Sequence, residues 1–268
     1  MTPAHLEDRA VIALAGPDAR GLLQGLITND IALLSAGVAL YAALLTPQGK
    51  ILFDFLIAEG DGAVLLDCAA DLAPALAKKL SLYRLRAKVE IELRPQLGVY
   101  AGLTGKPAVK AISFADPRLA ALGPRAIAAT AEMPAALADA ASYHATRLAL
   151  GVPEGNDFGS DRIFALDAGL DELHAISFDK GCYVGQELTA RMKHRGTARK
   201  RLMPVMAAAA LPAPGAAVTN GETQIGEIFA TYGTRGFALM RLDRLAEANG
   251  ALTSEGVSIT ITRPDWLR

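Results

Sequence analysis

The chain contains little cysteine and histidine, and this scarcity limits the metal chemistry that it can perform by itself. It is 268 residues long, with two cysteines, Cys68 and Cys182, and four histidines. The cysteines are far apart, and neither belongs to a CxxC or Cys/His ligand pattern. A resident zinc ion or iron–sulfur cluster needs about three or four such ligands. The sequence therefore predicts no permanently bound metal, and it argues against a disulfide framework.

Long hydrophobic runs are also absent. No stretch combines about 20 strongly apolar residues with a lack of charge, which is the length that a membrane helix needs. The first ten residues, MTPAHLEDRA, carry acids where a signal peptide would have a basic start and an apolar segment. The positive mean hydropathy of +0.26 comes largely from alanine. We therefore expect a cytoplasmic protein with no membrane partner.

Several motifs of enzymes and nucleic-acid-binding proteins are missing as well. The chain has no GxSxG nucleophile elbow, no GxxxxGK[ST] phosphate loop and no GxGxxG dinucleotide motif. Its net charge is −1, and aromatic residues make up only 6% of it. A nucleic-acid-binding domain usually has a strong basic excess, often interleaved with aromatic side chains. Direct binding of tRNA is therefore not expected.

The charges that are present lie in blocks along the chain. Residues 1–77 carry a net charge of −6, residues 78–110 carry +6, and residues 111–190 carry −6. The stretch RMKHRGTARKR, residues 191–201, then has six lysines and arginines and no acid. Such runs are either a solvated surface balanced by nearby acids or a binding face for an anionic partner. Both interpretations remain open at this point.

Hydrophobic periodicity predicts a mixed N-terminal region. Residues 41–68 are typical of three strands joined by tight turns at TPQG and EGDG, and this places Tyr41 and Asp54 on adjacent strands. Helices are expected from about Asp71 and over residues 132–150, with Gly151 as the stop of the second. Strands and helices that alternate irregularly, with hairpins, favour an α+β fold over a doubly wound sheet.

The pattern changes after Gly196. Short β-rich stretches such as TQIGEIFATYG and VSITIT are separated by segments rich in proline and glycine, such as LPAPG. This is typical of a small antiparallel barrel or sandwich. We predict two regions, an α+β part over residues 1–197 and a C-terminal β-barrel over residues 198–268.

The second cysteine lies in the motif KGCYVGQELTARMKHRG, residues 180–196. Val184, Leu188 and Met192 share one stripe of a short helix, and Glu187 can pair with Arg191 one turn later. Cys182 would then lie at or just before the helix N-terminus, close to Lys180. A helix N-terminus and a nearby cation both favour a thiolate. The alternative is that Cys182 is a small buried side chain, which is also our expectation for Cys68 at the end of an apolar strand.

This motif, KGCYVGQE followed by RMKHRG, resembles the signature of the YgfZ family. Those proteins bind folate and support iron–sulfur cluster assembly and repair, and they are related to mitochondrial cluster-assembly factors. GLLQGLITNDI (21–31), TPQGKILFDF (46–55) and GVPEGNDFG (151–159) resemble further blocks of that family. The resemblance covers about residues 10–245. The family is similar in turn to the T protein of the glycine cleavage system, a folate-dependent aminomethyltransferase.

The resemblance implies a T-protein-like fold of several modules around a folate cleft, with a β-barrel last. It sets Asp54 at the place of the T protein's essential aspartate, and Tyr41 at a tyrosine that contacts folate. The chain also departs from the T protein. Cys68 stands at an asparagine and Ala149 at a glutamate that both contact the ligand, and the T protein has no counterpart of Cys182. Folate binding is therefore expected to be weak, and the thiol indicates a different task.

The function implied by the resemblance is that of a tetrahydrofolate-binding accessory protein for assembly or repair of [4Fe–4S] enzymes, including radical enzymes that modify tRNA. Its partners would be iron–sulfur client enzymes or cluster carriers. Cys182 and Lys180 are the predicted catalytic residues, and the basic run 191–201 would hold folate's glutamate tail or an acidic partner. A folate-dependent aminomethyltransferase and an inert scaffold are the alternatives. The predicted cofactor-binding residues are Asn29, Tyr41, Asp54, Gly181, Tyr183, Gly185, Gln186, Glu187 and Arg191.

Overall fold

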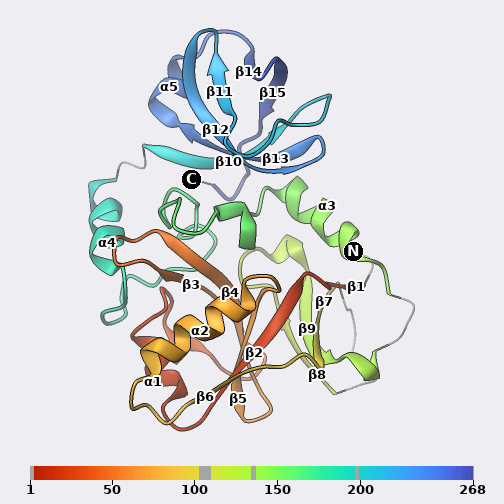
Figure 1. Ribbon diagram of the computed structural model, residues 1–268, viewed down its shortest axis with the longest axis vertical. Helices are drawn as coiled ribbons and strands as arrows, with labels where there is room; N and C mark the ends of the chain where they lie inside the picture. Colours follow the sequence, from red (N-terminus) through yellow and green to blue (C-terminus); the bar gives the residue numbers. More distant parts are fainter. Residues whose placement is uncertain (1–2, 103–109, 134–136, 197–198, 268) are drawn as a thin grey trace.

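Three β assemblies organise the protein. The computed structural model describes residues 3–102, 110–133, 137–196 and 199–267. Its strands form a five-stranded sheet of order β3-β4-β5-β2-β6, a four-stranded sheet of order β1-β7-β9-β8, and a closed barrel of order β10-β13-β12-β11-β14-β15. Figure 1 shows the barrel at one end and the two sheets at the other. The expected α+β architecture with a C-terminal antiparallel barrel is confirmed.

The five-stranded sheet contains the predicted hairpins. Every neighbouring pair is antiparallel, and Tyr41 and Asp54 lie on adjacent strands as expected. Two helices and a 3₁₀ turn cover one face and bury a core of their own with the sheet. Hydrophobic positions alternate along the strands, so the other face contributes to a second core. The elements are β2 (Arg9–Ala15), β3 (Leu40–Leu45), β4 (Ile51–Gly60), β5 (Ala63–Ala69), β6 (Glu90–Leu93), α1 (Ala19–Gln24), η1 (Ile31–Leu33) and α2 (Ala73–Arg84).

The four-stranded sheet is followed by a helix that begins later than predicted. Helix α3 starts at Ala140, not near residue 132, because the Asp139 side chain accepts a hydrogen bond from the Ala141 amide and caps it there. Gly151 ends the helix in a left-handed conformation, φ +69°, as expected. The elements are β1 (Ala4–His5), β7 (Leu97–Ala101), β8 (Ala111–Ala115), η2 (Ala120–Leu122), β9 (Pro124–Ala129), η3 (Thr130–Glu132) and α3 (Ala140–Leu150).

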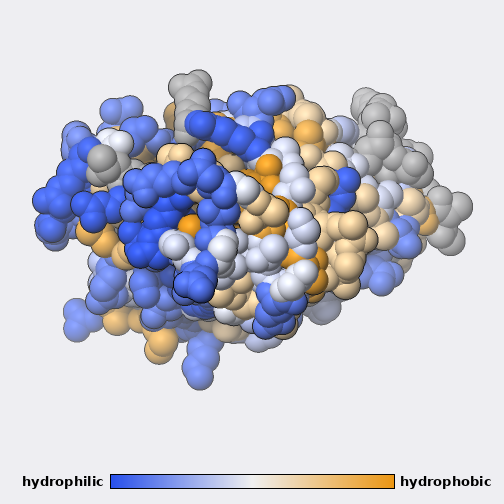
Figure 2. All heavy atoms as spheres, turned by 90° about the horizontal axis from the view of Figure 1, so that it is seen from above, coloured by the Kyte–Doolittle hydropathy of each residue, from blue (hydrophilic) through white to orange (hydrophobic). Residues whose placement is uncertain are grey.

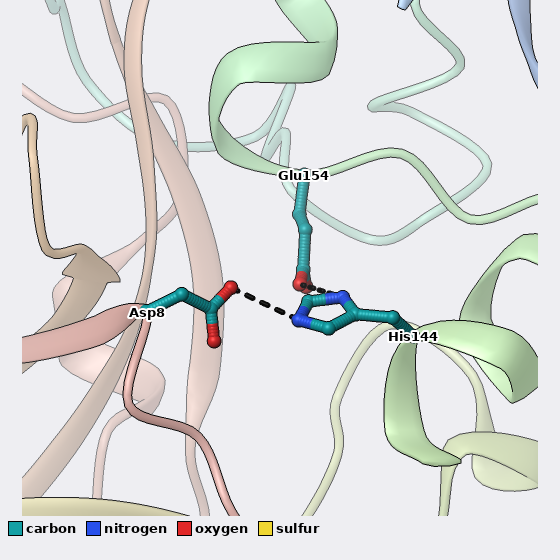
Figure 3. A group of neighbouring side chains, drawn as sticks. All are labelled: Asp8, His144 and Glu154. Atoms are coloured by element: carbon teal, nitrogen blue, oxygen red, sulfur yellow. Dashed lines mark ion pairs between the residues drawn. The ribbon is translucent and has the colours of Figure 1, made fainter. Parts of the chain in front are cut away.

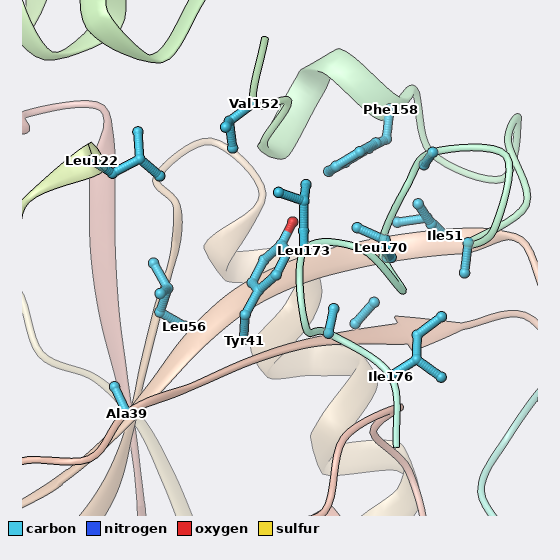
Figure 4. Packing of buried hydrophobic residues seen from close by; sticks show 14 of the residues in the cluster. Ala39, Tyr41, Ile51, Leu56, Leu122, Val152, Phe158, Leu170, Leu173 and Ile176 are labelled. Atoms are coloured by element: carbon cyan, nitrogen blue, oxygen red, sulfur yellow. The ribbon is translucent and has the colours of Figure 1, made fainter. Parts of the chain in front are cut away.

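Residues 151–185 cross the β3–β4 hairpin with little regular structure. They contain the turn η4 (Gly155–Phe158) and lead into helix α4 (Gln186–Arg195). The Ile51 amide donates to the Ile163 carbonyl at 2.9 Å, which ties the segment to β4. Figure 4 shows Leu170, Leu173 and Ile176 of this segment pointing toward the hairpin, with Tyr41 among them. The segment therefore closes the main core.

The C-terminal region forms a closed barrel with its own hydrophobic core. This settles the choice that the sequence left open between a barrel and a sandwich. The predicted boundary between residues 197 and 198 falls outside the described residues and stays a prediction. The elements are β10 (Lys200–Met206), β11 (Ala217–Asn220), β12 (Thr223–Tyr232), β13 (Arg235–Arg241), α5 (Leu242–Glu247), β14 (Leu252–Ser254) and β15 (Val257–Ile261).

Among the described residues, no helix is both long and apolar enough to span a bilayer. Figure 2 looks at the barrel end, where hydrophilic residues gather on one side and more hydrophobic residues show through on the other.

Asp167 lies at the junction between the barrel and the α+β region. Its carbonyl accepts a hydrogen bond from the Leu202 amide at 2.8 Å, and its carboxylate Oδ1 is buried without a hydrogen-bond donor among the described residues. Burial raises the pKa of Asp167 to about 6, although the charges of Arg201 and Lys200 oppose this.

This raised pKa predicts a pH-dependent stability. Between about pH 4 and 6 the folded state holds the Asp167 proton more tightly than the unfolded chain, so the free energy of unfolding should fall as pH rises. Asp167→Asn should remove this pH dependence. The free energy of unfolding of the variant minus that of the wild type should therefore be higher at pH 7.5 than at pH 4.5, by on the order of 2 kcal/mol. Urea unfolding at both pH values measures it. Asp265→Asn, at an exposed carboxylate, is the control, and an equal change in both variants would contradict the prediction.

Candidate functional site

The Cys182 thiol is exposed at the end of the segment that crosses the hairpin. It is a free cysteine, and the next side chain, Tyr183, is buried. Helix α4 starts only at Gln186, with Gly185 in a left-handed conformation before it. The prediction that Cys182 lies at or just before the helix N-terminus is therefore wrong, because Tyr183, Val184 and Gly185 separate it from the helix. The alternative of a small buried cysteine is also wrong.

Lys180 anchors the Cys182 loop from one side. Its ammonium group donates hydrogen bonds to the carbonyls of Gln24, Ile27 and Asn29, each at 2.8 Å. Burial lowers the pKa of Lys180 to about 8, while Asp30 opposes that shift. In this arrangement Lys180 holds the loop against the end of α1 and the turn after it. Its predicted catalytic role stays a prediction.

Gly185 fastens the loop from the other side. It has φ +84°, and a Cβ atom there would lie 2.5 Å from the Thr46 carbonyl oxygen and 2.9 Å from the Leu45 Cβ. Only glycine therefore fits where α4 begins against the TPQG turn. Segments 21–31 and 46–55 provide the groups that Lys180 and Gly185 contact, so these two segments hold the Cys182 loop in place.

The other predicted residues near Cys182 lie on the loop and the first turns of α4. Gly181 is exposed, and Gln186 is half-buried. The expected pair of Glu187 and Arg191 is confirmed, with a 2.7 Å contact on the exposed face of the helix. Such an exposed pair contributes little to stability, so both side chains remain available to a partner.

Tyr41 and Asp54 are brought together but are closed off from solvent. The Tyr41 hydroxyl donates to Asp54 Oδ2 at 3.0 Å, and the Gly155 amide donates to Asp54 Oδ1 at 2.8 Å. The two residues are 1% and 3% exposed. Burial raises the pKa of Asp54, and the charge of Arg9 opposes this. The pair does not fit a folate in this conformation, because both carboxylate oxygens are taken and the η4 turn covers them.

Asn29 connects this pair to the Cys182 loop. Its side-chain amide donates to the backbone carbonyls of Tyr41 and His174, both at 2.8 Å. The backbone carbonyl of Asn29 accepts a hydrogen bond from Lys180. Asn29 is 7% exposed. Its side chain therefore holds β3 and the crossing segment together, and both amide hydrogens are used within the protein.

Sequence reasoning missed a buried network of arginines and carboxylates beneath this region. Arg125 contacts Asp67 at 2.5 Å and Asp116 at 3.1 Å, and Arg118 contacts Glu154 at 2.6 Å. Burial acts to raise the pKa of Glu154, but Arg147, Arg118 and the other arginines outweigh it and hold that pKa well below its usual range. The members come from three strands, a helix, a 3₁₀ turn and loops, so no local spacing in the sequence reveals them. The network comprises Arg9, Asp67, Asp116, Arg118, Arg125, Tyr143, Arg147, Glu154 and Asp157.

A cavity of about 410 Å³ opens at the edge of this network. There His144 lies between two carboxylates, with Nε2 3.0 Å from Asp8 and Nδ1 4.0 Å from Glu154 (Figure 3). Imidazole and carboxylate groups can bind a divalent cation. However, the Arg147 guanidinium is 3.4 Å from the same Glu154 oxygen and already supplies positive charge. We therefore interpret the cluster as part of the ion-pair network.

Known proteins are similar to this chain along nearly its whole length. Residues 199–268 match the C-terminal beta-barrel domain of CAF17. The chain is 36% identical to the mitochondrial iron–sulfur cluster assembly factor IBA57 of Homo sapiens, over 98% of this chain and 84% of that protein. The Mus musculus protein matches equally well.

The chain belongs to the IBA57 family.

A Neurospora crassa homologue of IBA57 is 34% identical over 78% of this chain and 56% of its own length. The predicted relation to cluster-assembly factors is thereby confirmed, and IBA57 is the family that the relatives name. The expectation of a cytoplasmic protein is wrong by the same comparison, because these IBA57 relatives are mitochondrial proteins. Acidic residues in the first ten positions were no guide to the compartment.

A solved structure shares the fold of this IBA57 relative. The glycine cleavage system aminomethyltransferase T from Bartonella henselae superposes with a TM-score of 0.76, covering 98% of this chain and 85% of that chain. The identity is 17%, so the likeness concerns the fold. The predicted T-protein-like architecture is confirmed.

Proposed function

We propose that this protein is an accessory factor in iron–sulfur cluster assembly that presents the Cys182 thiol to a cluster held by a partner. Membership of a family of iron–sulfur cluster assembly factors supports the process. The exposed thiol on a firmly seated loop supports the residue, and it is the observation that carries the proposal. The thiolate is the form of cysteine that ligates metal and acts as a nucleophile.

A partner is required because Cys182 has no second cysteine to act with. Cys68 is 1% exposed within the core under α2, and burial raises its pKa to about 12. An iron–sulfur cluster generally needs about four thiolate or imidazole ligands. The remaining ligands would therefore come from the client or carrier. We propose [4Fe–4S] enzymes as the clients, including radical enzymes that modify tRNA, on the strength of the KGCYVGQE resemblance.

The basic run after the cysteine motif can orient such a partner. Within it, Lys193 pairs with Asp171 and Arg201 pairs with Glu172, in addition to the pair made by Arg191. The other cations, Arg195, Arg199 and Lys200, are exposed and make no ion pair with the described residues. These free charges would attract an acidic surface and steer its approach.

The test is whether the chain supports a cluster enzyme through Cys182. In cells that lack this protein, a [4Fe–4S] enzyme is assayed after restoring the wild type or Cys182→Ala. The alternative function, folate-dependent aminomethyl transfer, rests on the fold alone. Turnover of a methylamine donor with tetrahydrofolate, unaffected by Cys182→Ala, would favour that alternative.

Tetrahydrofolate binding is a separate part of the proposal. Because the η4 turn covers Asp54, binding at this position requires Gly155 to move, and we expect it to be weak. Asp54→Asn should weaken it about tenfold, since a hydrogen bond to a charged group contributes about 1.5 kcal/mol. Titration calorimetry measures the dissociation constants. Asp61→Asn, on the distant β4–β5 turn, should bind like wild type, and an equal affinity in all three proteins would contradict this site.

A further inference from the structure

The end of α2 and the turn after it form an exposed cationic surface. We call residues 78–88, KKLSLYRLRAK, the α2 cationic end. It contains five lysines and arginines and no acid. Lys78, Arg84, Arg86 and Lys88 are exposed, and Lys79 is half-buried with its ammonium over the Tyr83 ring. The helix lies on the outside of the five-stranded sheet, at the other end of the molecule from the barrel (Figure 1).

These cations are not neutralised by the rest of the described chain. None of the five makes an ion pair with a described carboxylate, in contrast to half of the run at residues 191–201. The nearest acids along the chain, Glu90 and Glu92, alternate with Ile91, which packs into the core beneath α2. Because successive side chains of a strand point to opposite faces, both acids lie on the far side of the sheet. Asp18 Oδ2 accepts a hydrogen bond from the Lys88 backbone amide at 2.7 Å, but it forms no ion pair with the five side chains, so most of their charge is open to an external anion.

Two leucines stand among these cations on the surface. Leu82 is 65% exposed and Leu85 is 87% exposed. Leu82 and Lys78 lie on the side of α2 opposite to its buried residues Ala73, Leu76 and Leu80, and Leu85 follows directly after the last residue of the helix, Arg84. Leu85 also has φ +45° and ψ −105°, a positive-φ conformation that is costly for a leucine. The exposed side chain of Leu85 therefore stands at a position where the backbone is also strained.

We propose that the α2 cationic end docks the protein on the surface of an anionic lipid bilayer. Leu82 and Leu85 enter the interfacial layer, while Arg84 and Arg86, which flank Leu85, contact lipid phosphates. Apolar side chains surrounded by lysine and arginine are typical of segments that lie in a bilayer surface. Such binding needs no membrane-crossing helix, so it is compatible with the described helices.

The composition favours a lipid surface over other anionic partners. A nucleic acid offers phosphates but no apolar layer for two exposed leucines. The core of a protein interface is depleted of lysine and enriched in aromatic residues, whereas this surface has three lysines and its one aromatic ring, Tyr83, is half-buried. An anionic bilayer provides both the phosphates and the apolar layer.

Sedimentation with vesicles tests the proposal on the full chain. Wild type should bind vesicles of phosphatidylcholine with about 30% phosphatidylglycerol, and should not bind phosphatidylcholine alone. Each lysine or arginine near an anionic surface raises the partition coefficient onto vesicles roughly fivefold. The double variant Arg84→Gln/Arg86→Gln should therefore lower this coefficient about 25-fold. Arg235→Gln/Arg263→Gln removes the same charge from exposed barrel positions and should change it less than twofold.

The apolar part is tested separately. Leu85→Ser should weaken partitioning about tenfold, since a leucine side chain loses its apolar transfer. Leu33→Ser is the matched control, because Leu33 is 60% exposed on η1. Circular dichroism and melting curves verify that every variant is folded. Equal losses in the variant and control pairs, binding to both vesicle types, or no binding at all would overturn the proposal. So would binding to an acidic protein or RNA with none to vesicles.

Discussion

Replacing Cys182 with alanine should abolish the support of a [4Fe–4S] enzyme while leaving the fold intact. We expect activity of the client enzyme to fall to the level of cells that lack the protein. The reason is that the exposed thiol has no substitute among the described residues, since the other cysteine is buried. Stability should change by less than about 0.5 kcal/mol, because Cys182 is exposed and substitutions at such surface positions usually have small effects.

Cys68 offers the matched control for this prediction. Cys68→Ala removes a sulfur from the core under α2 and should lower the free energy of unfolding by about 1 kcal/mol. It should nevertheless restore the client enzyme. Equal restoration by wild type and Cys182→Ala would keep the cluster role but make the thiol dispensable. Failure of the wild type itself would favour the folate-dependent transferase.

Replacing Arg125 with methionine should destabilise the protein strongly. Arg125 is 1% exposed and contacts Asp67, Asp116 and the Tyr143 hydroxyl. Methionine fills much of the volume but leaves Asp67 and Asp116 buried with one arginine fewer, since each then keeps only its pair with Arg9 or Arg118. Breaking a buried ion pair in this way costs about 3–5 kcal/mol. Urea unfolding at pH 7 measures the loss.

We attribute the expected loss of stability to the missing charge of Arg125 and not to the change in side-chain shape. Arg235→Met removes an arginine from the barrel surface and should cost less than about 0.5 kcal/mol. Adding Asp67→Asn to Arg125→Met should recover part of the loss, because it removes a buried carboxylate charge that Arg125 no longer helps to balance, and the two sites are coupled. A loss below about 1 kcal/mol in Arg125→Met would show that the network is not the electrostatic unit described here.

Local features were predictable from the sequence because they depend on neighbours in the chain. The hairpins at TPQG and EGDG, the cap at Gly151 and the Glu187–Arg191 pair each involve residues close in sequence. The start of α3 was wrong because the Asp139 cap competes with a longer apolar pattern. The helix at the cysteine motif was predicted, but its first turn was not, because Gly185 takes a left-handed conformation against the TPQG turn.

By itself the sequence determined the α+β class, the C-terminal β region and the family resemblance carried by KGCYVGQE, because periodicity and motif spacing are local properties. Only the tertiary structure decided that Cys182 is exposed, that Lys180 reaches three carbonyls about 150 residues away, and that Asp54 is covered by Gly155. The buried arginine network was decided there too. Long-range contacts of this kind leave no periodic trace in the chain, since each partner is chosen by the packing of separate elements and not by its neighbours in sequence.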